Sequence, residues 1–106
     1  MDRINTRTSE AGVVIFTPSG VLDFETAPVL SEALFAVLRD GTSRLVVDLA
    51  GVETIDSVAL GVLIAGLKSA RKNGGDLRLA SPSERVEKIL TLAGLKHIFK
   101  SADTAF

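Results

Sequence analysis

Two stretches decide the fold of this chain: RLVVDL at residues 44–49 and TIDSVALGVLIAGLKSARKNGG at residues 54–75. The first is a compact apolar run, typical of a strand that is buried on both faces, so we expect a central strand here. The second begins with Asp56 as a helix N-cap and continues as a helix that is apolar nearly all round. That helix is expected to end at residues 73–75, because asparagine and glycine favour the left-handed conformation that terminates helices.

Upstream of these stretches the pattern predicts a hairpin and a helix. Residues 5–10 and 13–18 are two short segments separated by a turn at residues 11–12, and the second segment is rich in β-branched side chains. They are expected to form an antiparallel hairpin. Apolar residues then recur at helical spacing over residues 25–39, and Pro28 falls in the first turn, where no amide donor is required.

Downstream, residues 76–80 alternate like a strand. A helix-start signature at residues 81–84, with Ser81 as the N-cap, then opens a helix that is expected to end at Gly94. The tail is interpreted as a short strand at residues 97–99 and the first turn of a helix at residues 101–106. The expected order is therefore β-β-α-β-α-β-α, which indicates a single α/β domain: a mixed, mostly parallel sheet opened by an antiparallel hairpin, with crossover helices.

Composition restricts the classes of function. The chain has 106 residues, 46% of them hydrophobic, and 12 Lys+Arg against 13 Asp+Glu, which leaves a net charge of -1. We therefore expect no direct contact with nucleic acid, because such binding depends on clustered basic residues. The chain has no cysteine and one histidine, so disulfides, thiolate nucleophiles and zinc sites are not expected.

Export and membrane insertion are not expected either. The N-terminal residues lack the apolar stretch and cleavage site of a signal peptide. The longest apolar run, residues 58–67, is about half the ~20 residues that a membrane-spanning helix needs. The sequence therefore predicts a cytoplasmic protein.

Motifs for catalysis or cofactor binding are missing from the sequence. It contains no phosphate-binding loop and no dinucleotide-binding glycine pattern, and no serine has a histidine partner suited to nucleophilic catalysis. His97, between Lys96 and Ile98, is interpreted as a packing or surface residue. We expect a protein that is not an enzyme and holds neither a cofactor nor a metal.

One position can carry chemistry of another kind. Ser57 follows the N-cap Asp56 as the first residue of the buried helix. These two residues can simply satisfy the free amides of a helix start. Alternatively, the Ser57 hydroxyl is exposed, and a phosphate placed on it would be stabilised by the helix amides and dipole.

The order and spacing of several short motifs resemble the bacterial anti-sigma factor antagonists of the STAS domain family. The resemblance covers nearly the whole chain and implies one STAS domain over residues 1–106. It rests on GVLD at 20–23, LVVDL at 45–49, VETIDS at 52–57, LGVL at 60–63, GG at 74–75 and AGL at 93–95.

In that family, the serine that directly follows the aspartate is phosphorylated by the anti-sigma factor, an ATP-dependent serine kinase of the GHKL fold. The resemblance therefore implies that Ser57 is the phosphorylation site. It also implies partner switching: the unphosphorylated protein binds the anti-sigma factor and frees the sigma factor, phosphorylation releases it, and a PP2C-type phosphatase resets it. The partner-binding residues implied are Asp23, Phe24, Asp56, Ser57, Val58 and Ala59.

Several of these residues also have structural interpretations. Asp23 can be the N-cap of the first helix or part of the docking surface, and for Phe24 we favour a hydrophobic staple over an exposed anchor. Relatives usually carry Ser or Thr and then Gly where this chain has Val58 and Ala59. This departure leaves an alternative function open, an accessory subunit of an ABC complex that transports lipids or solutes.

Overall fold

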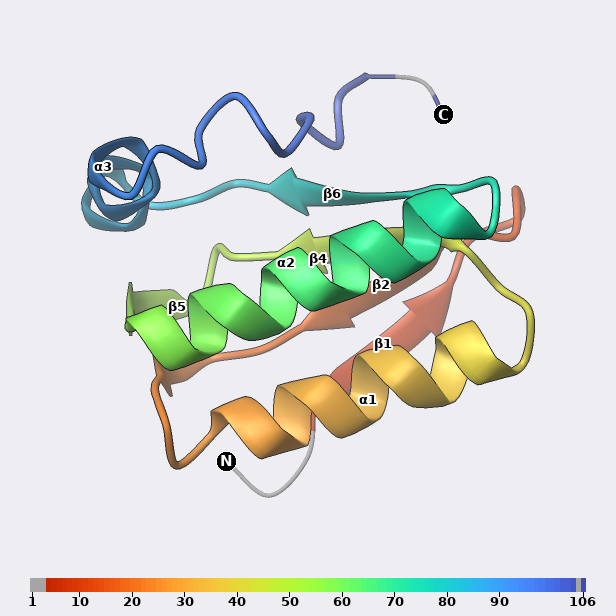
Figure 1. Ribbon diagram of the computed structural model, residues 1–106, viewed down its shortest axis with the longest axis horizontal. Helices are drawn as coiled ribbons and strands as arrows, with labels where there is room; N and C mark the ends of the chain where they lie inside the picture. The colour runs from red at the N-terminus through yellow and green to blue at the C-terminus, as the bar shows by residue number, and fades with distance from the viewer. Residues whose placement is uncertain (1–3, 105) are drawn as a thin grey trace.

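The computed structural model describes residues 4–104 and 106, which form a four-stranded sheet, a two-stranded sheet and three helices (Figure 1). The main sheet has the order β1-β2-β4-β6, in which β1 is antiparallel to β2 and the other pairs are parallel. The predicted fold class is therefore confirmed. The elements are β1 (Asn5–Thr8), β2 (Val14–Thr17), β3 (Gly20–Leu22), α1 (Ala27–Arg39), β4 (Arg44–Asp48), β5 (Val52–Ile55), α2 (Ser57–Lys72), β6 (Asp76–Ala80) and α3 (Glu84–Leu92).

The predicted central strand is β4, which pairs with β2 on one side and β6 on the other. Leu45 and Val47 are completely buried, and Val46, on the opposite face, is also buried. Burial on both faces explains why this strand is continuously apolar instead of alternating.

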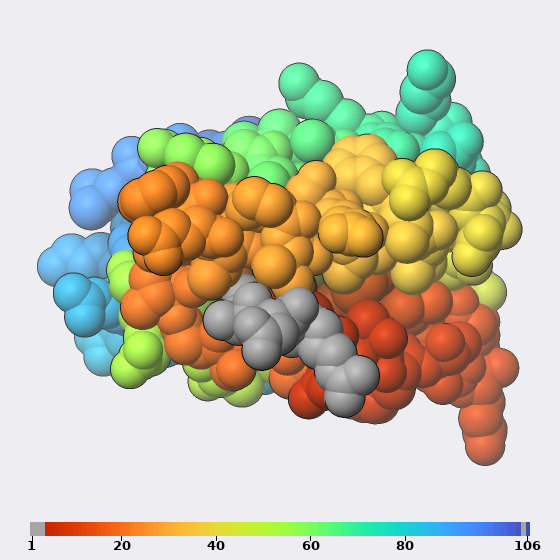
Figure 2. Space-filling view, turned by 90° about the horizontal axis from the view of Figure 1, so that it is seen from below, coloured from red at the N-terminus to blue at the C-terminus, as the bar shows by residue number. Residues whose placement is uncertain are grey.

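Helices α1 and α2 pack side by side on one face of the main sheet (Figure 1). Seen from below, α1 forms the orange and yellow band across the middle of the molecule, between red β-hairpin residues and green α2 residues (Figure 2). Gly66 of α2 permits this packing, because a Cβ there would lie 3.0 Å from Leu77 Cδ1 and 3.2 Å from Leu34 Cδ1. Gly61 of the same helix, by contrast, is exposed with nothing within 4 Å of its Cβ position.

Strands β3 and β5 were not predicted as a pair. They form a separate parallel sheet with an irregular register at Gly20 and Val21, next to the site described below. Each strand has only three or four residues, too few to show a clear alternation, and Pro18 and Gly51 interrupt the apolar runs on either side.

Two helix starts also differ from the predictions. The N-cap of α1 is Thr26, and the N-cap of α3 is Ser83, whose hydroxyl accepts a hydrogen bond from the Val86 amide at 3.1 Å. Ser81 lies outside the helix with a φ of 51°, so the helix-start signature was placed two residues too early.

Residues 97–99 do not form the predicted strand, and residues 101–104 do not form the predicted helical turn. The structure instead has a single bridge between Ser101 and Leu79 of β6, followed by turns through residue 104. Residue 105 lies outside the described residues.

Candidate functional site

The candidate site is built around the start of α2, where Asp56 is the N-cap. The Oδ1 atom of Asp56 accepts a hydrogen bond from the Ala59 amide at 2.9 Å. This bond satisfies one of the free amides of the first helical turn. Ser57 is the first residue of α2, as predicted, and it is exposed. Its hydroxyl forms no hydrogen bond with any other residue that the structure describes.

Asp56 also fixes the loop that precedes α1. Its Oδ2 atom accepts a hydrogen bond from the Phe24 amide at 2.9 Å, and its own amide donates to the Leu22 carbonyl at 2.9 Å. Because one side chain binds both segments, the loop after β3 and the start of α2 form a single surface. Sequence patterns could not reveal this contact, since the two residues are 32 positions apart.

Asp23 organises the same loop from within. Its Oδ1 atom accepts hydrogen bonds from the amides of Glu25 and Thr26 at 3.0 and 3.2 Å, while its own amide donates to Thr26 Oγ1 at 2.9 Å. These short-range bonds are those of an Asx turn. Asp23 is therefore not the N-cap of α1, and its contribution is to shape the loop that carries Phe24.

Exposed apolar side chains lie on the segments around Ser57. Phe24 is 65% exposed and Val58 is 50% exposed, and Val21 of β3 is 40% exposed. The favoured staple role for Phe24 is wrong, because Phe24 lies two residues before the N-cap Thr26 and most of its ring is in solvent. Single exposed apolar residues are ordinary, but several around one hydroxyl are typical of a protein-binding surface.

Ala59 differs from the other predicted partner-binding residues. Its side chain is completely buried, so it lies beneath this surface and contributes only its backbone amide to the Asp56 cap. We call the exposed residues Phe24, Ser57 and Val58, together with the half-buried Asp23, the Ser57 surface. Val21 extends it and was not among the predicted site residues, because the strand β3 was not recognised in the sequence.

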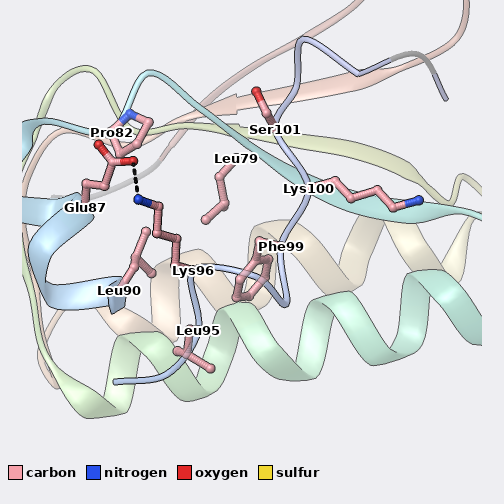
Figure 3. A pocket seen from close by; sticks show the side chains of 9 residues that line it. All are labelled: Leu79, Pro82, Glu87, Leu90, Leu95, Lys96, Phe99, Lys100 and Ser101. Carbon is pink, nitrogen blue, oxygen red and sulfur yellow. Dashed lines mark ion pairs between the residues drawn. The ribbon is translucent and has the colours of Figure 1, made fainter. Parts of the chain in front are cut away.

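A small pocket of about 240 Å³ lies elsewhere, between α3 and the C-terminal segment (Figure 3). Its wall is largely apolar, with Leu79, Leu90 and Phe99 among the lining residues, and an ion pair joins Lys96 and Glu87 at 3.7 Å. The lining contains no residue of the Ser57 surface and no arrangement of nucleophile and base.

Across residues 4–104 and 106, no three His, Asp or Glu side chains come close enough together to hold a metal ion. In the same part of the chain, none of the helices combines the length and the hydropathy needed to cross a bilayer.

Residues 4–105 match the family model of the STAS domain. An anti-sigma factor antagonist of Thermotoga maritima is 40% identical over 93 residues, which cover 87% of this chain and 82% of the relative. An anti-sigma-B factor antagonist of Staphylococcus aureus is 34% identical over 79 residues, which cover 74% of this chain and 73% of the relative. A crystal structure of a Thermotoga maritima anti-sigma factor antagonist superposes with a TM-score of 0.87 at 36% identity, covering 95% of this chain and 86% of the other.

Proposed function

Because this chain belongs to the STAS domain family, we propose that it is an anti-sigma factor antagonist, a regulator that acts by binding another protein and not by catalysis. The names of its relatives from Thermotoga and Staphylococcus support this role. The exposed apolar residues of the Ser57 surface support it independently, since they suit a protein partner.

The proposed switch is phosphorylation of Ser57. The observation that carries it is the position of an exposed hydroxyl on the first residue of a 16-residue helix, directly after its cap. A phosphate there adds about -1.5 to -2 charge at neutral pH. The positive end of the helix dipole stabilises that charge, so the modified protein can remain folded.

The same phosphate opposes binding of the partner. The unphosphorylated surface offers Phe24 and Val58 as exposed apolar anchors together with a small hydroxyl. A partner that fits this surface would meet both the bulk of the phosphate and its charge. Rejection needs only a few kcal/mol, because each 1.4 kcal/mol is a tenfold change in affinity.

The partners follow from this proposal. The anti-sigma factor is a serine kinase of the GHKL type that binds the unphosphorylated protein, and a PP2C-type phosphatase removes the phosphate. Both act in the cytoplasm, where the sigma factor is held and released.

The test is to isolate the wild-type protein with the partners it captures from its own cell extract, add ATP and magnesium, and follow its intact mass. We expect one phosphate on the wild type and loss of a small kinase from the complex. Ser57→Ala should gain no phosphate, whereas Ser19→Ala, a change at an exposed serine outside the site, should behave as the wild type. An unmodified protein that remains bound to an ABC-type ATPase would refute the switch and support the transport-subunit alternative.

A further inference from the structure

A second cleft, of about 280 Å³, has a lining rich in cationic side chains. The lining includes four cationic side chains and one carboxylate. The cationic residues are Arg44, Arg71, Arg78 and Lys100, and the carboxylate belongs to Asp76. We propose that this cleft binds the phosphoryl group of a small soluble phosphate ester. The proposal does not depend on the function proposed for Ser57.

The cleft lies at the opposite end of α2 from Ser57. Arg71 is in the last turn of that helix, and Arg44 and Asp76 are the first residues of β4 and β6. A helix of 16 residues is about 24 Å long. The cleft is therefore separate from the Ser57 surface.

Asp76 organises two of the arginines. Its Oδ1 atom accepts from Arg71 Nε at 2.9 Å and its Oδ2 atom accepts from Arg78 Nε at 3.0 Å. The side chains of Asp76 and Arg78 are only 9% and 6% exposed, respectively. Hydrogen bonding to Asp76 on one edge fixes how both guanidinium groups are oriented, so this part of the cleft is formed before any ligand binds.

The arginines keep donors for a ligand. Arg71 also donates to the Ile98 carbonyl, Arg78 to the Thr104 carbonyl and Arg44 to the Ala11 carbonyl. A guanidinium carries about five N–H donors, so one or two bonds on each arginine leave others unused, and those of the more exposed Arg44 and Arg71 are accessible to a ligand. Within the described residues, Lys100 forms no ion pair, and its side chain extends along β6, away from the pocket near α3 (Figure 3).

The charge in the cleft is unusual for this chain. The whole protein carries a net charge of -1, yet four cationic groups line the cleft with a single carboxylate. Such a concentration of one sign raises the local concentration of oppositely charged ligands. The arginine fork matches the geometry of phosphate oxygens, and charge-assisted bonds of this kind are the stronger class of hydrogen bond.

The volume of the cleft limits the size of the phosphate compound that it can hold. Drug-sized ligands occupy pockets of about 300–1,000 Å³, so about 280 Å³ suits a phosphoryl group with a small attached moiety. The Phe106 ring packs 4.0 Å from the guanidinium carbon of Arg78 and lines one side of the cleft. A concave site with these walls fits a free phosphate ester better than a lipid headgroup at a membrane surface.

The test uses the full chain, labelled with ¹⁵N, titrated with inorganic phosphate and with glycerol phosphate at physiological ionic strength. We expect saturable changes in the NMR chemical shifts of the backbone amides of the cleft, and no such changes at the Ser57 surface. The variant Arg44→Gln with Lys100→Gln should weaken binding about tenfold or more. Lys68→Gln with Lys72→Gln removes the same charge from exposed lysines outside the cleft and should bind as the wild type.

Several outcomes would overturn the proposal. Shifts that are not saturable at millimolar phosphate, or equal loss of binding in the two double variants, would mean that the ligand senses only general charge. Binding to vesicles that contain phosphatidic acid, without binding of free phosphate, would assign the cleft to a membrane instead. The single variant Lys100→Gln, which removes no protein hydrogen bond found in the described residues, provides the same comparison if Arg44→Gln disturbs folding.

Discussion

The carboxylate of Asp56 joins two segments that lie 32 positions apart, because Oδ2 accepts a hydrogen bond from the backbone amide of Phe24 at 2.9 Å. Its other oxygen accepts from the amide of Ala59, also at 2.9 Å. Asp56 thus caps the helix that begins at Ser57 and also holds the loop that carries Phe24, the aromatic residue of the Ser57 surface.

Asp56→Asn separates these two roles. The amide oxygen of asparagine can still accept from Ala59, but its NH₂ group then faces the Phe24 amide, donor against donor. We expect the α2 cap to survive and the Phe24 amide to exchange with solvent faster, at a cost of about 1 kcal/mol in unfolding free energy. Hydrogen exchange resolved by residue checks this. Unchanged protection of Phe24 in the variant would contradict the proposed link.

Phe24→Ala tests whether the exposed ring is a binding anchor. Since the side chain is 65% exposed, the free energy of unfolding should change by no more than about 0.5 kcal/mol. The affinity for the anti-sigma factor should fall about tenfold, as expected for an aromatic anchor at an interface. Ile98→Ala is the matched control: Ile98 is 42% exposed, and its carbonyl binds Arg71 near the other end of α2. Equal effects of the two changes on affinity would refute the role of Phe24.

The two glycines of α2 should respond oppositely to alanine. Gly61→Ala adds a methyl group with nothing within 4 Å, so it should stabilise the protein by up to about 1 kcal/mol through helix propensity. Gly66→Ala places its Cβ against Leu77 and Leu34, both completely buried, and overpacking of about 1–3 kcal/mol should outweigh that gain. Urea unfolding of both variants decides the matter, and a stabilised Gly66→Ala protein would show that these leucines can move aside.

Asp76 should make stability depend on pH. Burial alone would raise the pKa of its carboxyl group, but hydrogen bonds from Arg78 and Arg71 and the charge of Arg71 outweigh that effect and lower the pKa. A carboxyl group whose pKa is lowered on folding stabilises the protein above its unfolded pKa, and this contribution is lost as pH falls through the folded value.

Asp76→Asn should therefore cost about 3–5 kcal/mol at neutral pH, because two arginines lose their buried partner. The difference from the wild type should shrink at about pH 3, which lies below the unfolded pKa of about 3.9, because the stabilisation is lost progressively as the pH falls from that value toward the lowered folded pKa. Urea unfolding at both pH values measures this. A difference that does not depend on pH would show that packing, and not charge, explains the loss.

The sequence predicted the elements whose patterns are long or carry a strong cap. Strand β4, helix α2 and the cap at Asp56 were identified because continuous apolar runs and an aspartate at a helix start are local signals. The pairing of β3 with β5 was missed, because strands of three or four residues carry too little alternation. The N-cap of α3 was misplaced because serines at positions 81 and 83 both suit a cap, and only the backbone geometry distinguishes them.

The candidate site was predictable in part for the same reason. The places of Asp56 and Ser57 follow from the helix start, which is local. The exposure of Phe24, the burial of Ala59 and the bond between Asp56 and Phe24 depend on how the loop after β3 approaches α2. That approach is set by tertiary packing between distant segments, which no spacing in the sequence encodes.

The most direct test of the proposed switch is the affinity of the purified protein for its anti-sigma factor, measured by calorimetry with Ser57 unmodified and with Ser57 phosphorylated. We predict tight binding of the unmodified form and a loss of about 100-fold or more on phosphorylation, since a charge mismatch at an interface costs several kcal/mol. Equal affinity of the two forms would contradict the switch.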